Sequence, residues 1–191
     1  MNTTVAFLAQ TLAIFMGFFT RVVFTRTLSE GYVGINGLFT DILNILSLSE
    51  LGVGTAITYA LYAPIARRDI KKQQILMRMF RNFYRITAGF VLLAGLCLIP
   101  FLDILMKDRP DVNHLIIIYL LYLLNSVVSY LLIYKKTLVD AHQMNYITVM
   151  YHNGFLVLQD ILQIMVLFLT RNFILFLVIA VVCTIIGNIC M

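Results

Sequence analysis

Charged side chains are scarce in this sequence, and that scarcity excludes a water-soluble protein. Asp, Glu, Lys and Arg make up 12% of the 191 residues, whereas hydrophobic residues make up 61%. A soluble domain carries about 25% charged residues. The mean hydropathy of +0.94 points the same way, so most of the chain needs lipid as its solvent.

Catalytic and metal-binding motifs are also lacking. The sequence contains no P-loop, GxGxxG, HExxH or nucleophile elbow. Neither its three cysteines nor its three histidines have a metal-ligand spacing, and no CxxC pair suggests a disulfide framework. We therefore expect no enzyme, no cofactor and no bound metal. The net charge of +5 is explained by basic loops beside a membrane, so no nucleic-acid partner is expected.

Apolar segments long enough to cross a bilayer account for most of the chain. A spanning helix needs roughly 20 mostly apolar residues. The apolar runs lack the alternation of a barrel strand, and backbone groups in hydrocarbon must pair within the segment, so we expect helices. The fold class is all-α, a polytopic integral membrane protein. The expected helices cover residues 4–24, 35–62, 86–106, 114–134, 146–169 and 173–190.

Basic residues in the loops predict the orientation. Nine of them flank one side of the expected bundle and four flank the other. The first group is Arg67, Arg68, Lys71, Lys72, Arg78, Arg81, Arg85, Lys135 and Lys136, and the second is Arg26, Lys107, Arg109 and Arg171. Because cytoplasmic loops carry the excess of Lys and Arg, both termini and the loop 63–85 are expected in the cytoplasm.

The loop 63–85 has a helical pattern of its own. Apolar residues such as Ile75, Met79 and Phe83 recur at helical spacing, and Lys71, Arg78, Arg81 and Arg85 form a second stripe. This pattern predicts an amphipathic interfacial helix that runs into the third membrane helix. Two roles remain open: an anchor on anionic lipid headgroups, or a surface that collects an anionic lipid-linked substrate.

Polar residues gather on the second and fifth expected helices. On 35–62 a stripe of about 120° includes Asp41 and Asn44, with Glu50 to one side, and on 146–169 a narrower stripe includes His152 and Gln159. Embedded charges such as Asp41, Glu50, Asp160 and Arg21 cost about 2.5–3.5 kcal/mol each without a partner or water. The stripes serve either as contacts that hold helices together or as a polar translocation pathway between the first, second and fifth helices. In the second case they face each other or a shared hydrated cavity.

Three stretches resemble a known family. They are GYVGINGLFTDILNILSLSELGVGTAITYALYAPIA followed by a basic loop and NFYR, then IYKKTLVDAHQMNYI, and then LQDILQIMVLFLTRNFILFLVI. The resemblance is to bacterial polysaccharide and O-antigen flippases (Wzx-type) of the multidrug/oligosaccharidyl-lipid/polysaccharide exporter superfamily, with Gram-positive members closest in character. It covers nearly the whole chain.

The resemblance implies a fold and a function that the residues alone do not. Family members have 12–14 helices in two lobes around a central cavity, so residues 1–191 would be the N-terminal six-helix lobe without the second one. The implied activity is alternating access that flips an undecaprenyl-pyrophosphate-linked glycan across the cytoplasmic membrane for capsule, exopolysaccharide or O-antigen synthesis. A second lobe or a polysaccharide polymerase, together with membrane lipids, are the other implied partners.

Within this resemblance, cationic cavity residues hold the pyrophosphate, and Arg21 and Arg26 match that role because an arginine fork suits phosphate oxygens. A lipid-facing Arg21 that reaches the headgroups is the alternative. The full expected substrate-binding set is Arg21, Arg26, Asp41, Asn44, Glu50, His152, Gln159 and Asp160. Two other functions stay open: export of drugs or small molecules in the same superfamily, and a membrane-embedded polysaccharide-biosynthesis enzyme, which the short outward loops disfavour.

Overall fold

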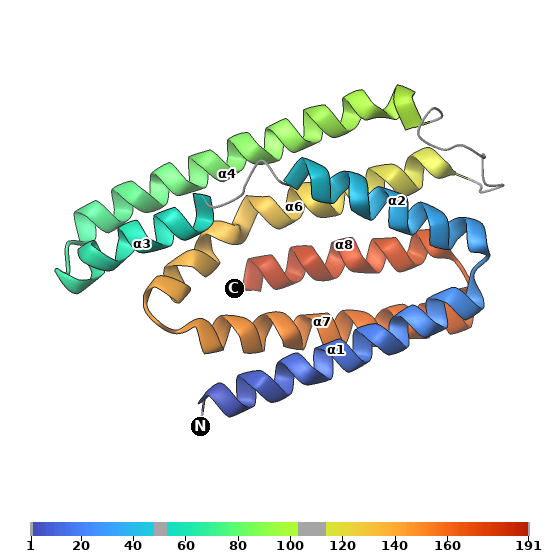
Figure 1. The fold of residues 1–191 in the computed structure, drawn as a ribbon, viewed down its shortest axis with the longest axis horizontal. Helices are drawn as coiled ribbons and strands as arrows, with labels where there is room; N and C mark the ends of the chain where they lie inside the picture. The colour runs from blue at the N-terminus through green and yellow to red at the C-terminus, as the bar shows by residue number, and fades with distance from the viewer. Residues whose placement is uncertain (1, 48–52, 103–113, 191) are drawn as a thin grey trace.

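The computed structural model describes residues 2–47, 53–102 and 114–190, and every regular element among them is helical. The helices are α1 (Asn2–Thr27), α2 (Glu30–Ser47), α3 (Val53–Ala66), α4 (Ile70–Leu98), the 3₁₀ turn η2 (Ile99–Phe101), α6 (Leu115–Ala141), α7 (Asn145–Thr170) and α8 (Phe173–Cys190). Figure 1 shows them lying roughly along one common axis.

Five segments of the described chain are long and apolar enough to cross a membrane. They are Phe7–Thr27, Ile70–Phe101, Leu115–Ala141, Asn145–Thr170 and Phe173–Cys190. The chain is therefore a multi-pass membrane protein, as its composition predicts. The expected helix 35–62 is divided between α2 and α3, and residues 48–52 between them, including the candidate Glu50, lie outside the described residues.

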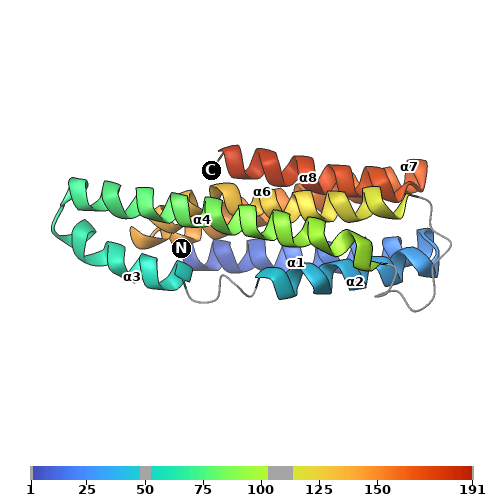
Figure 2. The same ribbon diagram turned by 90° about the horizontal axis from the view of Figure 1, so that it is seen from above.

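The connections sort to two ends of the bundle (Figures 1 and 2). Both termini, the α3–α4 turn and the α6–α7 turn lie toward one end, which we call the termini side. The α1–α2 and α7–α8 turns lie toward the opposite end, which we call the far side. The α3–α4 hairpin also extends beyond the ends of the other helices at the termini side (Figures 1 and 2).

Some helix boundaries differ from the sequence-based expectation. The helix α1 continues to Thr27, so Arg26 lies in its last turn rather than beyond the helix. The helix α6 continues to Ala141, seven residues past the expected end, because Tyr130, Thr137 and Ala141 recur at helical spacing on a buried face. Lys135 and Lys136 are therefore helical, not part of a loop.

The expected interfacial helix and the third membrane helix form one element, α4. Its N-terminus is capped by Asp69, whose carboxylate accepts a hydrogen bond from the Lys72 backbone N–H at 3.0 Å. The preceding turn uses Arg68 in the left-handed region at φ 54°, and Gln73 Nε2 donates to the Pro64 carbonyl at 3.1 Å. The hairpin between α3 and α4 is thus closed by local hydrogen bonds.

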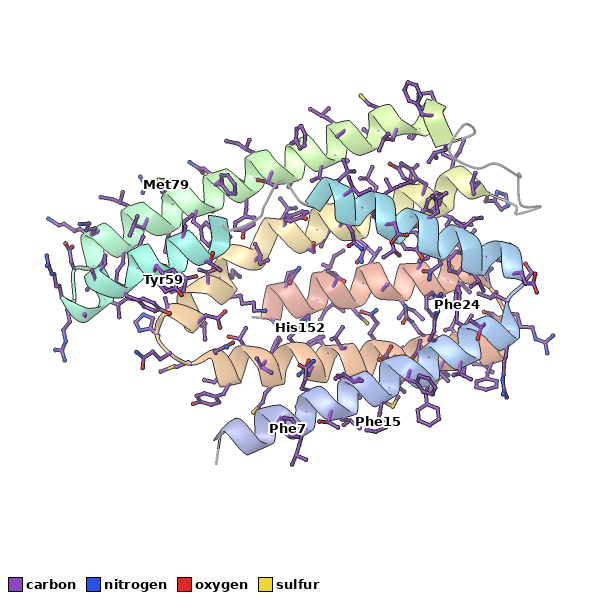
Figure 3. All side chains as sticks on the ribbon, in the orientation of Figure 1. Phe7, Phe15, Phe24, Tyr59, Met79 and His152 are labelled. Atoms are coloured by element: carbon purple, nitrogen blue, oxygen red, sulfur yellow. The ribbon has the colours of Figure 1, made fainter. Side chains whose placement is uncertain are left out.

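The largest fully buried side chains are aromatic, and aliphatic and aromatic side chains also cover the outside. Phe24, Phe39 and Tyr119 are buried, and the ring centroids of Phe39 and Tyr119 are 5.1 Å apart. Phe7 and Phe15 on α1 are 70% and 60% exposed, and Figure 3 shows them pointing away from the bundle. Large exposed apolar side chains are suited to contact with acyl chains rather than water.

A close approach between neighbouring helices joins α4 to α6 at Gly95. A Cβ built at Gly95 would lie 2.9 Å from Cδ2 of Leu123, so only glycine fits there without a shift. The approach also lets the Tyr119 hydroxyl donate to the Gly95 carbonyl at 2.8 Å. A small residue at this crossing therefore fixes the spacing of two membrane helices.

Candidate functional site

A pocket of about 250 Å³ lies between α6, α7 and α8, in the half of the bundle nearer the termini side. Close packing of α8 on α7 forms one wall, because a Cβ at Gly187 would already be 3.3 Å from Cδ1 of Phe155. The lining residues with polar groups are Asn125, Ser129, Lys136, Tyr151, His152, Gln159, Cys183, Thr184 and Asn188. The pocket thus brings together His152 and Gln159, two of the expected site residues.

Neutral amides and hydroxyls supply most of the polarity of this pocket. Asn188 Nδ2 donates to the Val128 carbonyl at 3.3 Å, and Ser129 Oγ donates to the Ser126 carbonyl at 2.6 Å. The side-chain oxygen of Asn125 is buried without a hydrogen-bond donor in the described part of the chain. Such a group is stabilised by water or by a ligand that donates to it.

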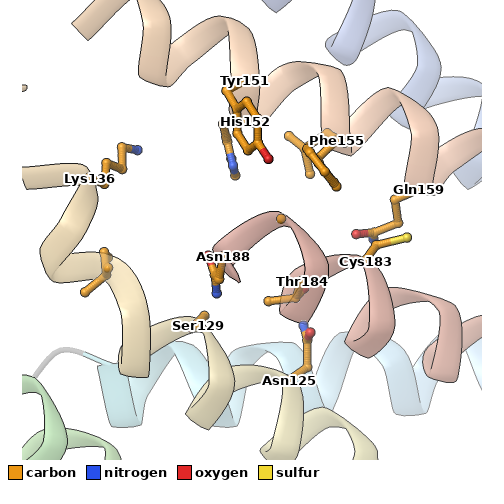
Figure 4. Close-up of a pocket in the computed structure, with 13 residues that line it drawn as sticks. Asn125, Ser129, Lys136, Tyr151, His152, Phe155, Gln159, Cys183, Thr184 and Asn188 are labelled. Atoms are coloured by element: carbon orange, nitrogen blue, oxygen red, sulfur yellow. The ribbon is translucent and has the colours of Figure 1, made fainter. Parts of the chain in front are cut away.

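Lys136 supplies the cationic edge of the pocket. Figure 4 shows its side chain extending from α6 toward His152 on α7, while His152 and Tyr151 point toward the end of α8 near Asn188. Among the described residues, none that lines the pocket carries a carboxylate. It can therefore accept hydroxyl groups along its length and an anionic or electron-rich group at the Lys136 edge.

A second polar region joins α1 to α7, the pair of helices with the most extensive packing. Asn153 Nδ2 donates to Gln10 Oε1 at 2.9 Å. Two helical turns further along both helices, a Cβ at Gly17 would lie 4.0 Å from the Asp160 carboxylate. The equal spacing of seven residues means that α1 and α7 run parallel and in register.

Asp160 is half-buried in this α1–α7 seam, close to Thr20. The Thr20 hydroxyl donates to the Met16 carbonyl at 3.0 Å. No cation forms an ion pair with Asp160 within the described ranges. Asp160 therefore faces a neighbouring helix of the same bundle, and it does not line the pocket between α6, α7 and α8.

Arg21 follows Thr20 at the far-side end of the α1–α7 seam, and Arg26 lies further along α1; neither lines the pocket between α6, α7 and α8. Both side chains are exposed. The Arg21 guanidinium carbon is 5.5 Å from the centroid of the Phe24 ring. The guanidinium also interacts electrostatically with the Tyr122 phenol of α6. The Tyr122 hydroxyl in turn donates to the Asn36 side-chain oxygen on α2. Arg21 is thus placed where α1, α2 and α6 approach one another.

The polar stripe of α2 is uncovered by the other described helices. Thr40, Asp41 and Asn44 are exposed, whereas Ile42 and Leu43 are buried on the opposite face. The helix α2 packs mainly on α6 and α4, and α7 packs mainly on α1, α8 and α6. The idea that the two stripes pack directly on each other is therefore corrected: the apolar face of α2 packs on α6 instead, with Phe39 against Tyr119 and Tyr122.

The contribution of α6 and α8 to the pocket is not evident from hydropathy, because their polar residues are isolated within long apolar runs. These residues are Asn125, Ser129 and Lys136 on α6 and Thr184 and Asn188 on α8. The spacing of these polar residues could have indicated a shared helix face. Asn125 and Ser129 on α6 are four residues apart, and so are Thr184 and Asn188 on α8.

No family model, curated protein or solved structure matches this chain.

Proposed function

We propose that this chain is the N-terminal six-helix lobe of a transporter that flips a polyprenyl-pyrophosphate-linked oligosaccharide across the cytoplasmic membrane. The five spanning segments, together with α2 and α3 as a sixth pass, are compatible with such a lobe. Support for the substrate comes from the resemblance of three long stretches of the sequence to polysaccharide flippases. The second lobe would be supplied by further chain or by another subunit.

The observation that carries the transporter proposal is the exposed polar stripe on α2. Asp41 and Thr40 are exposed, whereas Ile42 belongs to the face of α2 that is packed in the bundle. An acidic side chain facing hydrocarbon costs about 2.5–3.5 kcal/mol. That face therefore needs water or polar helices beside it, and a hydrated cavity facing a second lobe provides both.

The positions of the other candidates are compatible with alternating access. His152 and Gln159 line a pocket in the half of the bundle near the termini side, whereas Arg21 and Arg26 lie toward the far side. A substrate that enters from one side and leaves on the other would meet these groups in sequence. The pyrophosphate would be held by the arginine forks through charge-assisted hydrogen bonds.

Water accessibility of single cysteines tests the hydrated cavity. In a background in which Cys97, Cys183 and Cys190 are replaced by alanine, we expect thiolate-specific reagents to modify cysteines at Asn44, Thr55, His152 and Gln159. Cysteines at Leu43 and Leu158 should stay unmodified, because the first side chain is buried and the second is exposed on the lipid-facing outside. Equal protection at all six positions would mean that the polar stripes only hold helices together.

Orientation in the membrane is tested by labelling from outside the cell. Both termini, the α3–α4 turn and the α6–α7 turn share one end of the bundle, and we expect that end to face the cytoplasm because most of the basic residues lie in the turns and helix ends there. An impermeant thiol reagent should therefore modify Arg171→Cys, in the α7–α8 turn, but not Ile70→Cys or Gln143→Cys. The reverse pattern would invert the orientation.

Export of small molecules is the second candidate, and the pocket itself favours it. A volume of about 250 Å³ is close to the lower limit of roughly 300 Å³ for sites that enclose small organic ligands. The two candidates differ in what a pocket variant loses. Thr184→Leu, which fills the pocket, should reduce drug or small-molecule efflux under the second candidate, and should reduce only surface glycan under the first.

A further inference from the structure

A second pocket lies between α4 and α6, near the base of the projecting α3–α4 hairpin. It has a volume of about 400 Å³ and is lined by Gln74, Met77, Arg78, Arg81 and Tyr134. It shares no residue with the pocket between α6, α7 and α8. Two guanidinium groups, one amide and one phenol hydroxyl therefore converge on a space outside the candidate transport site.

The hydrogen bonding of Arg81 points to a missing anion. Its Nε atom is buried and has no acceptor among residues 2–47, 53–102 and 114–190. Arg81 as a whole is partly buried, and leaving one buried guanidinium N–H without an acceptor is unfavourable. The segment Ile70–Phe101 contains no Asp or Glu that could neutralise it. Arg78 lies one helical turn before Arg81, so both side chains can reach the same ligand.

The depth of the pocket identifies the kind of anion. With a rise of 1.5 Å per residue, a hydrocarbon core of about 30 Å takes up roughly 20 residues. Counting back from Phe101 places Arg78 and Arg81 at the level of the lipid headgroups. On the hydrocarbon side of them, Ile86 is 73% exposed and Phe90 is 56% exposed. These apolar side chains are placed to touch acyl chains.

We propose that the Arg78–Arg81 pocket binds the phosphate of an anionic phospholipid from the leaflet at the termini side. The arginine forks match phosphate oxygens, and Gln74 and Tyr134 add uncharged donors. The excess positive charge favours an anionic headgroup, because the ammonium of a zwitterionic lipid would find no carboxylate among the described residues that line the pocket. This site anchors the α3–α4 hairpin and is independent of the transported substrate.

Lipid retention by the purified full chain tests the proposal. The chain in detergent is mixed with equal amounts of dioleoylphosphatidylglycerol and dioleoylphosphatidylcholine, and bound lipids are counted by native mass spectrometry. The double variant Arg78→Gln/Arg81→Gln should retain at least about tenfold less phosphatidylglycerol. The matched control Arg67→Gln/Lys71→Gln removes the same charge at the hairpin tip, and should lose less than about twofold because both side chains are outside the pocket.

Three outcomes would overturn the proposal. Equal loss by the two double variants would mean diffuse attraction to basic residues and no site. Displacement of phosphatidylglycerol by millimolar inorganic phosphate would assign the pocket to a free phosphate. If the double variant fails to fold, Arg81→Lys keeps the charge but lacks Nε, and unchanged phosphatidylglycerol retention by that variant would contradict the role of Arg81.

Discussion

Replacing Arg21 with alanine should reduce glycan export about tenfold or more while the amount of protein in the membrane stays normal. Under the proposed function, the Arg21 guanidinium binds pyrophosphate oxygens, and hydrogen bonds to charged groups contribute about 1.5–3 kcal/mol. Arg21→Lys should also impair export, because an ammonium lacks the paired donors of the guanidinium. Export is measured as surface glycan in cells that depend on this protein.

The control for Arg21 is Arg171, an exposed arginine on the same side of the bundle in the α7–α8 turn. Arg171 has a left-handed backbone at φ 49°, so asparagine is the suitable replacement. Arg171→Asn should export normally. Full export by Arg21→Ala at normal abundance would show that Arg21 only reaches the headgroups, as a lipid-facing arginine does.

Substituting valine for Gly95 should produce the largest loss of stability expected from one added side chain. The new atoms would overlap Leu123, which is 1% exposed and has little room to move. Overpacking of a buried contact costs about 1–3 kcal/mol, which corresponds to a fall of roughly 2–12 °C in Tm for a chain of this size. The measurement is thermal unfolding of the purified protein in detergent.

Gly89 provides the matched control on the same helix, because a Cβ at that position meets no atom within 4 Å. Gly89→Val should leave the Tm nearly unchanged. Adding Leu123→Ala to Gly95→Val should restore part of the loss, since it removes the overlapping atoms. Similar Tm values for the two valine variants would contradict a tight contact between α4 and α6.

Hydropathy predicted the membrane helices well where apolar character and helical structure end together. The expected segments 146–169 and 173–190 match α7 and α8 to within one residue at each end. It failed where a helix leaves the hydrocarbon: α4 begins at Ile70, and α6 continues through Lys135 and Lys136 to Ala141. Hydropathy indicates whether a residue is surrounded by lipid or by water. A helix, in contrast, continues for as long as its backbone hydrogen bonds and its contacts with other helices continue.

The candidate site was predictable only in part, because a pocket is a property of three helices at once. The stripe on α7 indicated His152 and Gln159, but the partners on α6 and α8 are single polar residues within long apolar runs. The apolar face of α2, with Phe39 fully buried, determined which way its polar stripe points. The direction of the polar stripe therefore depends on how α2 packs against α6, and the sequence of α2 alone does not reveal that packing.

The parallel pairing of α1 with α7 has a consequence for how the protein is made. Gln10 and Asn153 are 143 residues apart, and at about 5–20 residues per second a ribosome needs on the order of ten seconds to cover that interval. Throughout that time the Gln10 amide has no Asn153 to bond with, and an unpaired amide in lipid is unfavourable. Until α7 is synthesised, α1 therefore lacks its main packing partner, and a ribosome that stalls before α7 leaves α1 without the contact that pairs its Gln10 amide.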